Sequence, residues 1–135
     1  MLKELRVIRY KEKIEFIVAS VESIPGEPKG DIEVSATYYK LITAIEAGMD
    51  IVAMLLKDLG EKVSDDYSNI ELMVQEGYIS SKLGKNLMDC NGMRNRLVHR
   101  YEKVEEEVVI GSLGEVISSL YELIERTEVV LNEIE

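Results

Sequence analysis

Residues 83–101 have the sequence LGKNLMDCNGMRNRLVHRY and combine a helical pattern with the only histidine of this 135-residue chain. Six positions in this stretch recur at alternating steps of four and three residues, which places them on one face of an α-helix: Leu83, Leu87, Cys90, Arg94, Leu97 and Tyr101. Arg94 therefore stands where the pattern calls for an apolar side chain. Because a guanidinium is costly to bury unless it is paired, Arg94 is expected either to meet an acidic partner or to have a function.

The neighbouring face of this helix carries Asn95 and His99, four residues apart. The Asn95 amide is expected to hold one imidazole nitrogen and to fix the tautomer of the other. A lone histidine is more often a surface or packed residue than a catalyst, but the nearness of Arg94 and Tyr101 favours a function. Arg94 and His99 are five residues apart, about 140° around a helix. If they act together, either the helix is distorted or a second copy of the chain completes the site, which favours a dimer.

These residue types suit RNA cleavage without a metal ion. An imidazole titrates close to neutral pH, so it can take the proton from a 2′-hydroxyl or return one to the leaving oxygen. A guanidinium stabilises the extra negative charge of the transition state and binds two phosphate oxygens at once. The acidic residues are scattered over several faces and one histidine cannot form a histidine-rich centre, so we expect no metal and no other cofactor.

Along the whole chain, apolar spacing, N-cap residues and glycine or proline stops predict five helices, including the one just described. They run from Leu2 to about Ser23, from an N-cap at Asp31 to about Leu59, from a capping box at Ser68 and Glu71 to Gly77, from Ser80 or Ser81 to Tyr101, and from a capping box at Ser112 and Glu115 through Leu131. Residues 102–111 fit a loop or a helix. The predicted fold is an all-α bundle of four long helices and one short helix, in a single domain over residues 1–135.

The composition supports this fold class. Two prolines, no tryptophan and one phenylalanine favour helices over a sandwich of short strands. The single cysteine, Cys90, excludes an internal disulfide and a multi-cysteine metal site, and it is predicted to be a packed, unreactive thiol. No apolar stretch approaches the ~20 residues of a membrane span, and no charged leader precedes a short apolar run. We therefore expect a cytoplasmic protein without a membrane partner.

The net charge of −10 argues at first against a nucleic-acid partner, because contacts to phosphate need Lys and Arg. The charge is unevenly distributed, however. Between Lys82 and Lys103, six basic and two acidic residues give a local charge of +4, which leaves −14 for the rest of the chain. Since a basic segment on an acidic body can steer a polyanion locally, the sequence permits RNA binding around this stretch.

The segment Arg94-Asn95-Arg96-Leu97-Val98-His99-Arg100-Tyr101 resembles the HEPN superfamily, and specifically the HepT toxins. The motif of these toxins is Arg, four residues, His, one residue and Tyr, and every position is present here. The segments Asp66-Tyr67, Gly77-Tyr78-Ile79 and Gly92-Met93 also resemble the family, so that the resemblance spans most of the chain. An Arg-x4-His pair alone is a weak signal, whereas the longer motif at the end of a helical bundle is specific.

The resemblance implies an all-helical homodimer in which the motifs of both chains face one cleft. It implies a metal-independent endoribonuclease with Arg94 and His99 as the catalytic pair and Asn95 as its support. The basic residues Arg96, Arg100 and Lys103 of the same stretch are the expected RNA contacts, because of their positive charge. HepT proteins are toxins of type VII toxin–antitoxin pairs, and their RNA substrate here would be a tRNA or an mRNA. Their antitoxin is an MntA-type nucleotidyltransferase that transfers AMP to the motif tyrosine, which corresponds to Tyr101. Phosphate charge placed there would oppose the binding of RNA.

Two other interpretations remain open at this point. The chain is alternatively a non-catalytic helical subunit that presents substrate, or its own Tyr101, to a minimal nucleotidyltransferase. It is otherwise a plain helical dimer in which Arg94 is structural. Aromatic residues that can stack on bases, namely Tyr38, Tyr39 and Tyr67, are better explained as core or interface residues.

Overall fold

The computed structural model describes the chain except for residues 1–3, 100 and 135, and it describes Glu102 by its backbone alone. Five α-helices and one short 3-10 helix make up the described part: α1 (Glu4–Glu22), α2 (Gly30–Asp58), α3 (Asp66–Gln75), α4 (Ser81–His99), η1 (Tyr101–Lys103) and α5 (Glu106–Ile134). No strand occurs among these residues. The predicted bundle of four long helices and one short helix is confirmed.

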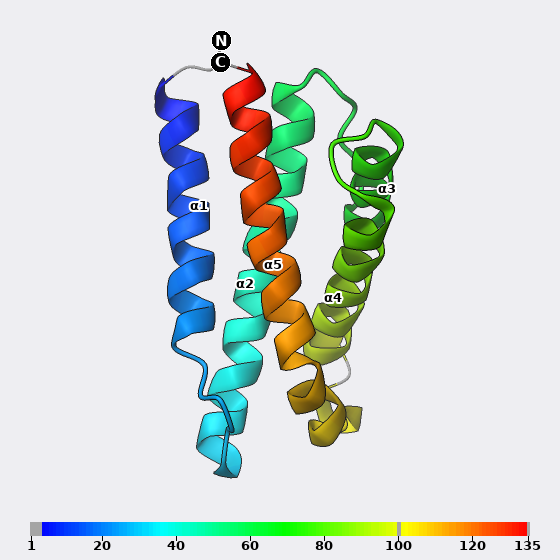
Figure 1. The fold of residues 1–135 in the computed structure, drawn as a ribbon. Helices are drawn as coiled ribbons and strands as arrows, with labels where there is room; N and C mark the ends of the chain where they lie inside the picture. Colours follow the sequence, from blue (N-terminus) through cyan, green and yellow to red (C-terminus); the bar gives the residue numbers. More distant parts are fainter. Residues whose placement is uncertain (1–3, 100, 135) are drawn as a thin grey trace.

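Helix α2 is the centre of the bundle and contacts each of the other α-helices. In Figure 1, α1 and α5 stand beside it, and α3 and α4 lie on the far side of α5 from α1. The side chains of Leu41, Ile45, Ile51 and Leu55 on α2 are fully buried. The end of α4, η1 and the start of α5 lie at the same end of the bundle as the turn between α1 and α2 (Figure 1). This end therefore brings Tyr101 close to the first half of α2, where it contacts Tyr38 and Ser35.

Helix starts agree only in part with the predicted caps. Ser80 caps α4 as expected, since its Oγ accepts a hydrogen bond from the Leu83 amide at 3.1 Å. Asp31 is not an N-cap: α2 begins at Gly30, whose φ of +78° suits a glycine, and its N-cap residue, Lys29, makes no side-chain cap hydrogen bond. The N-cap residue of α3 is Asp65, three residues before Ser68, the predicted N-cap. The Asp65 side chain accepts a hydrogen bond from the Ser68 amide at 2.9 Å, so Ser68 lies in the first turn of the helix.

The predicted start of the last helix at Ser112 is wrong, because α5 begins at Glu106. Val109, Leu113 and Val116 are all buried and follow the i, i+4, i+7 spacing of one helix face. The buried stripe thus extends upstream of Ser112, which lies inside the helix and donates its hydroxyl to the Val108 carbonyl at 2.8 Å. Of the undecided residues 102–111, the first part belongs to η1 and the last part to α5.

Helix α1 contacts α2 through hydrogen bonds and ion pairs as well as through apolar packing. Arg6 Nη2 lies 2.9 Å from Asp58 Oδ2, and the Tyr10 hydroxyl donates to the same oxygen. Tyr10 is fully buried, and this burial, with the Asp58 carboxylate beside it, raises the pKa of its phenol. Further along, Lys13 Nζ lies 2.8 Å from Asp50 Oδ2. None of the described helices is long and apolar enough to span a membrane.

The crossing of α3 and α4 requires a glycine. An ideal Cβ at Gly84 would overlap Val74 Cγ2, whereas a Cβ at Gly114 in α5 would meet nothing within 4 Å. We therefore expect Gly84→Ala to lower the free energy of unfolding by about 1–3 kcal/mol through overpacking. Gly114→Ala is the control, and it should raise that free energy by about 0.5–1 kcal/mol by reducing backbone freedom. Urea denaturation measures both, and an unchanged or more stable Gly84→Ala would contradict the close crossing.

Candidate active site

Arg94 is held in a fixed position by two neighbours. Its Nε donates to Glu46 Oε2 on α2 at 3.0 Å, its Nη2 donates to the same oxygen, and its Nη1 donates to Asn95 Oδ1 at 2.9 Å. The Arg94 side chain is 26% exposed and that of Glu46 is 42% exposed. These contacts explain how an arginine can stand on the apolar face of α4: its charge is paired, and the end of its side chain still reaches solvent. Three of the five guanidinium N–H groups are used by these partners in the described part of the chain, which leaves two for an anion.

The predicted hydrogen bond from Asn95 to His99 does not form among the described residues. Asn95 Oδ1 accepts from Arg94, and Asn95 Nδ2 lies 3.4 Å from the hydroxyl of Tyr67 on α3. The guanidinium outcompetes an imidazole four residues away because it offers a charged donor to the amide oxygen. Asn95 therefore supports the arginine directly, and not the histidine. Glu46, Arg94, Asn95 and Tyr67 form one polar chain that joins α2, α4 and α3.

Several carboxylates surround this chain. Asp66, at the start of α3, has a raised pKa because its carboxylate is partly desolvated and because Asp50, Asp65 and Glu46 add negative charge nearby. The Arg94 guanidinium opposes that rise. Arg94 therefore lies among carboxylates, of which Glu46 accepts its hydrogen bonds and Asp50 is paired with Lys13.

His99 and Tyr101 are exposed at the end of α4 and in η1. The Tyr101 ring packs edge-on against Tyr38, with ring centroids 5.8 Å apart and planes at 77°. Its hydroxyl lies 3.4 Å from Ser35 Oγ on α2, and the residue is 51% exposed. Tyr101 thus departs from the buried face on which its spacing places it, because α4 ends at His99 and the chain turns into η1. The ring is anchored while the hydroxyl stays accessible.

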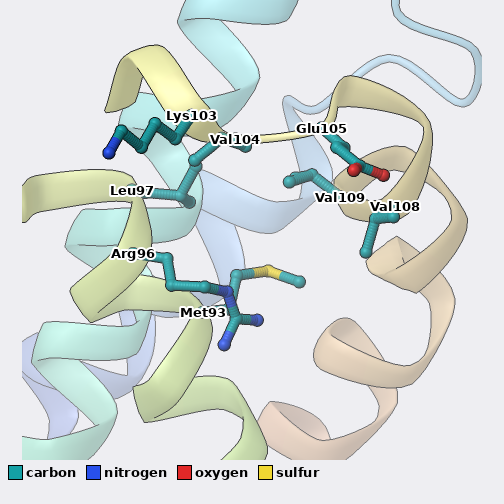
Figure 2. A pocket seen from close by; sticks show the side chains of 8 residues that line it. All are labelled: Met93, Arg96, Leu97, Lys103, Val104, Glu105, Val108 and Val109. Atoms are coloured by element: carbon teal, nitrogen blue, oxygen red, sulfur yellow. The ribbon is translucent and has the colours of Figure 1, made fainter. Parts of the chain in front are cut away.

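The predicted RNA contacts fall in different places. Arg96 and Lys103 are exposed and line a pocket between the end of α4, η1 and the start of α5 (Figure 2). Arg100 lies outside the described residues. The Arg96 side chain extends back along α4 toward Gly92. A Cβ atom built on Gly92 would lie 3.6 Å from Arg96 Nη1 and 3.6 Å from the Tyr67 hydroxyl. Arg96 therefore lies between the pocket and the polar chain of Arg94.

Other chemistry finds no support in the described residues. Cys90 is 3% exposed, and burial raises the pKa of its thiol to about 12, so it is an unreactive core residue as predicted. No group of three or more metal-ligating side chains comes together in this part of the chain. Of the tyrosines considered as base-stacking residues, Tyr38 is buried whereas Tyr39 and Tyr67 are exposed.

Two residues of this site were missed from the sequence. Glu46 is one of 26 acidic residues, and the only signal for it is that an apolar stretch of α2, ITAIEAGMDIVAM, is interrupted by two charged residues, Glu46 and Asp50. Tyr67 follows two aspartates in what appears in the sequence as a polar loop. Both reach Arg94 or Asn95 across more than 25 positions of chain, and helical spacing relates only residues within one helix.

Comparison with known proteins identifies related sequences. The sequence pattern of the family described as "Ribonuclease HepT-like" matches residues 12–127. A protein of Archaeoglobus fulgidus named "Putative RNase" is 50% identical over 131 residues, which cover 97% of this chain and 99% of that protein. A second A. fulgidus protein of the same name is 36% identical over 120 residues, covering 88% and 90% of the two chains.

Solved structures share the fold at lower identity. A mutant of the toxin–antitoxin pair named MntA-HpeT superposes with a TM-score of 0.81 at 17% identity, covering 90% of this chain and 98% of that one. A tri-AMPylated Shewanella oneidensis HEPN toxin, solved in complex with its MNT antitoxin, gives a TM-score of 0.80 at 16% identity, covering 95% and 99%. The bundle is therefore of the HEPN type.

Glu46 is expected to restrain the Arg94 guanidinium. In the wild-type chain, proton exchange at Arg94 Nε should be slower than at the exposed Arg9, because Glu46 accepts this hydrogen bond. Glu46→Ala should speed it by roughly 10-fold, the effect of losing a charge-assisted hydrogen bond. Nuclear magnetic resonance of the arginine Nε–H groups measures the rates. Asp50→Ala is the matched control, because Asp50 pairs with Lys13; equal rates in all three proteins would show that the pair does not persist in solution.

Proposed function

Because the chain belongs to the HepT-like ribonuclease family, we propose that it is a metal-independent endoribonuclease in which Arg94 and His99 cleave RNA. The observation that carries this proposal is the state of the two side chains. Arg94 is oriented by Glu46 and Asn95 yet keeps two N–H groups for an anion, and His99 is exposed at the end of the same helix. Phosphodiester cleavage needs an oriented cation and an accessible acid–base group, and the chain supplies one of each.

The proposed reaction uses the substrate's own 2′-hydroxyl. A neutral imidazole takes the 2′-hydroxyl proton while the 2′-oxygen forms a bond to phosphorus, and the bond from phosphorus to the 5′-oxygen breaks. The same imidazole, now an imidazolium, gives this proton to the leaving 5′-oxygen, so that the products are a 2′,3′-cyclic phosphate and a 5′-hydroxyl end. Arg94 donates to the non-bridging oxygens, whose negative charge grows in the transition state. Every bond change is thus served by a side-chain type present at the site, and no metal takes part.

The proposed site is shared between two copies of the chain. Arg94 and His99 are about 140° apart around α4, and the guanidinium of Arg94 is directed to Glu46 and Asn95. Next to Tyr101, the start of α2 exposes an apolar stripe with Ile32 at 87% and Tyr39 at 67%. A two-fold partner that covers this stripe would place its own motif opposite the first one.

Tyr101 is the proposed site of control. Its hydroxyl oxygen would attack the α-phosphorus of ATP on a partner nucleotidyltransferase, forming a tyrosyl–AMP ester and releasing pyrophosphate. The half-exposed side chain and the ring packed on Tyr38 support this role. The added phosphate would lie two residues from His99 and would repel an incoming RNA phosphate. The chain would then be the toxin of a toxin–antitoxin pair with an MntA-type antitoxin.

His99→Ala is expected to lower RNA cleavage by about 10²-fold or more, the usual contribution of general acid–base catalysis. The measurement is cleavage of tRNA and total RNA in excess EDTA, after intact mass has shown that the chain is unmodified. Lys85→Ala, an exposed change on the same helix, should cleave like the wild type. A mixture of the inactive Arg94→Ala and His99→Ala chains should regain activity, because a mixed dimer contains one complete shared site. Absence of cleavage by the folded, unmodified wild type would instead favour the non-catalytic binding subunit.

Tyr101→Phe should remain an active ribonuclease that a partner nucleotidyltransferase no longer silences. With ATP and an MNT-type enzyme, the wild-type chain should gain the mass of one or more adenylyl groups and lose activity, since the modified tyrosine blocks RNA. Tyr121→Phe, at a partly exposed tyrosine of α5 outside the proposed site, should behave like the wild type. Adenylylation of Tyr101→Phe to the same extent would place the modification elsewhere.

A further inference from the structure

The pocket beside η1 lies next to the proposed catalytic residues but has no part in the cleavage described above. Its volume is about 280 Å³, close to the lower limit of roughly 300 Å³ for small-molecule pockets. Figure 2 shows residues of α4 on one side and residues of the 104–109 segment on the other. The lining residues are Met93, Arg96, Leu97, Lys103, Val104, Glu105, Val108 and Val109.

The chemistry of the lining is divided. Five of the eight side chains are apolar, and Met93, Leu97 and Val109 among them belong to the core, so this wall is firmly held. The three charged side chains, Arg96, Lys103 and Glu105, are all exposed. A ligand with an apolar face, a polar edge and a negative charge outside the pocket would match this division.

We propose that the pocket binds an unpaired base of the RNA strand, next to the phosphate that is cleaved; this inference rests on the proposed ribonuclease function. A nucleobase has two flat apolar faces and a polar edge, and its phosphates stay outside, where Arg96 and Lys103 can contact them. A paired base has its Watson–Crick edge occupied and its faces stacked, so it cannot enter. The substrate is therefore single-stranded at the cleavage site.

The position of Arg96 connects the pocket with the catalytic residues. Arg96 and His99 are three residues apart on α4, which separates them by about 60° around the helix. The Arg96 guanidinium also approaches the Gly92 surface, which the Tyr67 hydroxyl reaches from the other side. A strand that crosses α4 here would contact Arg96 between its bound base and the phosphate at His99.

Glu105 makes the pocket selective. An ionised carboxylate only accepts hydrogen bonds, so Glu105 favours a base that donates from an amino group. Adenine, cytosine and guanine carry exocyclic amino groups, whereas uracil does not. We therefore assign to Glu105 a preference against uracil in the base that the pocket holds.

The test measures binding separately from cleavage. Single-stranded RNA with 2′-O-methyl groups cannot be cut through its own 2′-oxygen, and fluorescence anisotropy gives its Kd for the full-length chain. Val108→Trp fills the pocket from a residue that is 53% exposed, and it should weaken binding by roughly 10-fold, the effect of losing one base contact. Val129→Trp, at a valine of α5 that is 40% exposed and does not line the pocket, should bind like the wild type. Equal Kd values for the two variants would overturn the proposal.

Base preference provides the second measurement. The wild-type chain should bind oligo(A) and oligo(C) more tightly than oligo(U), and Glu105→Gln should reduce this difference while Glu107→Gln, outside the pocket, should not. A preference that Glu105→Gln leaves intact would remove Glu105 from the recognition of the base. If wild-type RNA is never cleaved but Val108→Trp still weakens binding, the pocket stands and the ribonuclease proposal fails. If the wild-type chain cleaves RNA and Val108→Trp binds RNA normally, the ribonuclease proposal stands and the pocket proposal fails.

Discussion

The burial of α2 is the constraint on which the other helices depend. Because α2 contacts all the other α-helices, most of its surface is apolar and buried, and its charged residues lie only in the gaps between these contacts. Each ion pair between different helices in the described residues has its carboxylate in one of these gaps: Arg6 with Asp58, Lys13 with Asp50, and Arg94 with Glu46. Partly exposed pairs of this kind contribute only about 0–1 kcal/mol each. Packing therefore holds the bundle together, and the carboxylates determine where three basic side chains lie.

The site follows from this arrangement. Arg94 lies on the face of α4 that packs against α2, and Glu46 is the acidic residue of α2 that accepts its hydrogen bonds. Asn95 and Tyr67 extend the contact to α3, so that three helices fix one guanidinium. His99 and Tyr101 are placed differently, because they lie where α4 ends and both remain exposed, although the Tyr101 ring packs against Tyr38 of α2. An oriented guanidinium, an exposed imidazole and an exposed phenol are thereby combined on one helix and the turn that follows it.

Charge gives the two sides of α4 different tasks. On the side toward α2 and α3, Arg94 is paired with Glu46, and Asp66 lies near enough to feel its charge. The side toward η1 and α5 has Arg96 and Lys103 above an apolar wall. Arg94 and Arg96 are two residues apart, about 160° around the helix, so these two sides of α4 face nearly opposite directions. In the proposed function the first side would supply the reaction and the second the affinity for the RNA strand, so that a chain with a net charge of −10 would still bind a polyanion locally.

The sequence by itself determined the helix count, the buried faces and the residues of the motif, because 3.6-residue periodicity and glycine or proline stops act within a few residues of one another. The caps were predicted less well: Ser80 was correct, whereas α3 starts at Asp66 and α5 at Glu106, where competing hydrogen bonds and a buried valine moved the boundaries. Only the tertiary structure decided that Asn95 contacts Arg94 and not His99, that Glu46 and Tyr67 belong to the site, and that a pocket opens beside Arg96. These contacts join residues far apart in the chain, and their existence depends on how the helices are turned about their axes. That rotation is set by the packing of the whole core, which no local pattern contains.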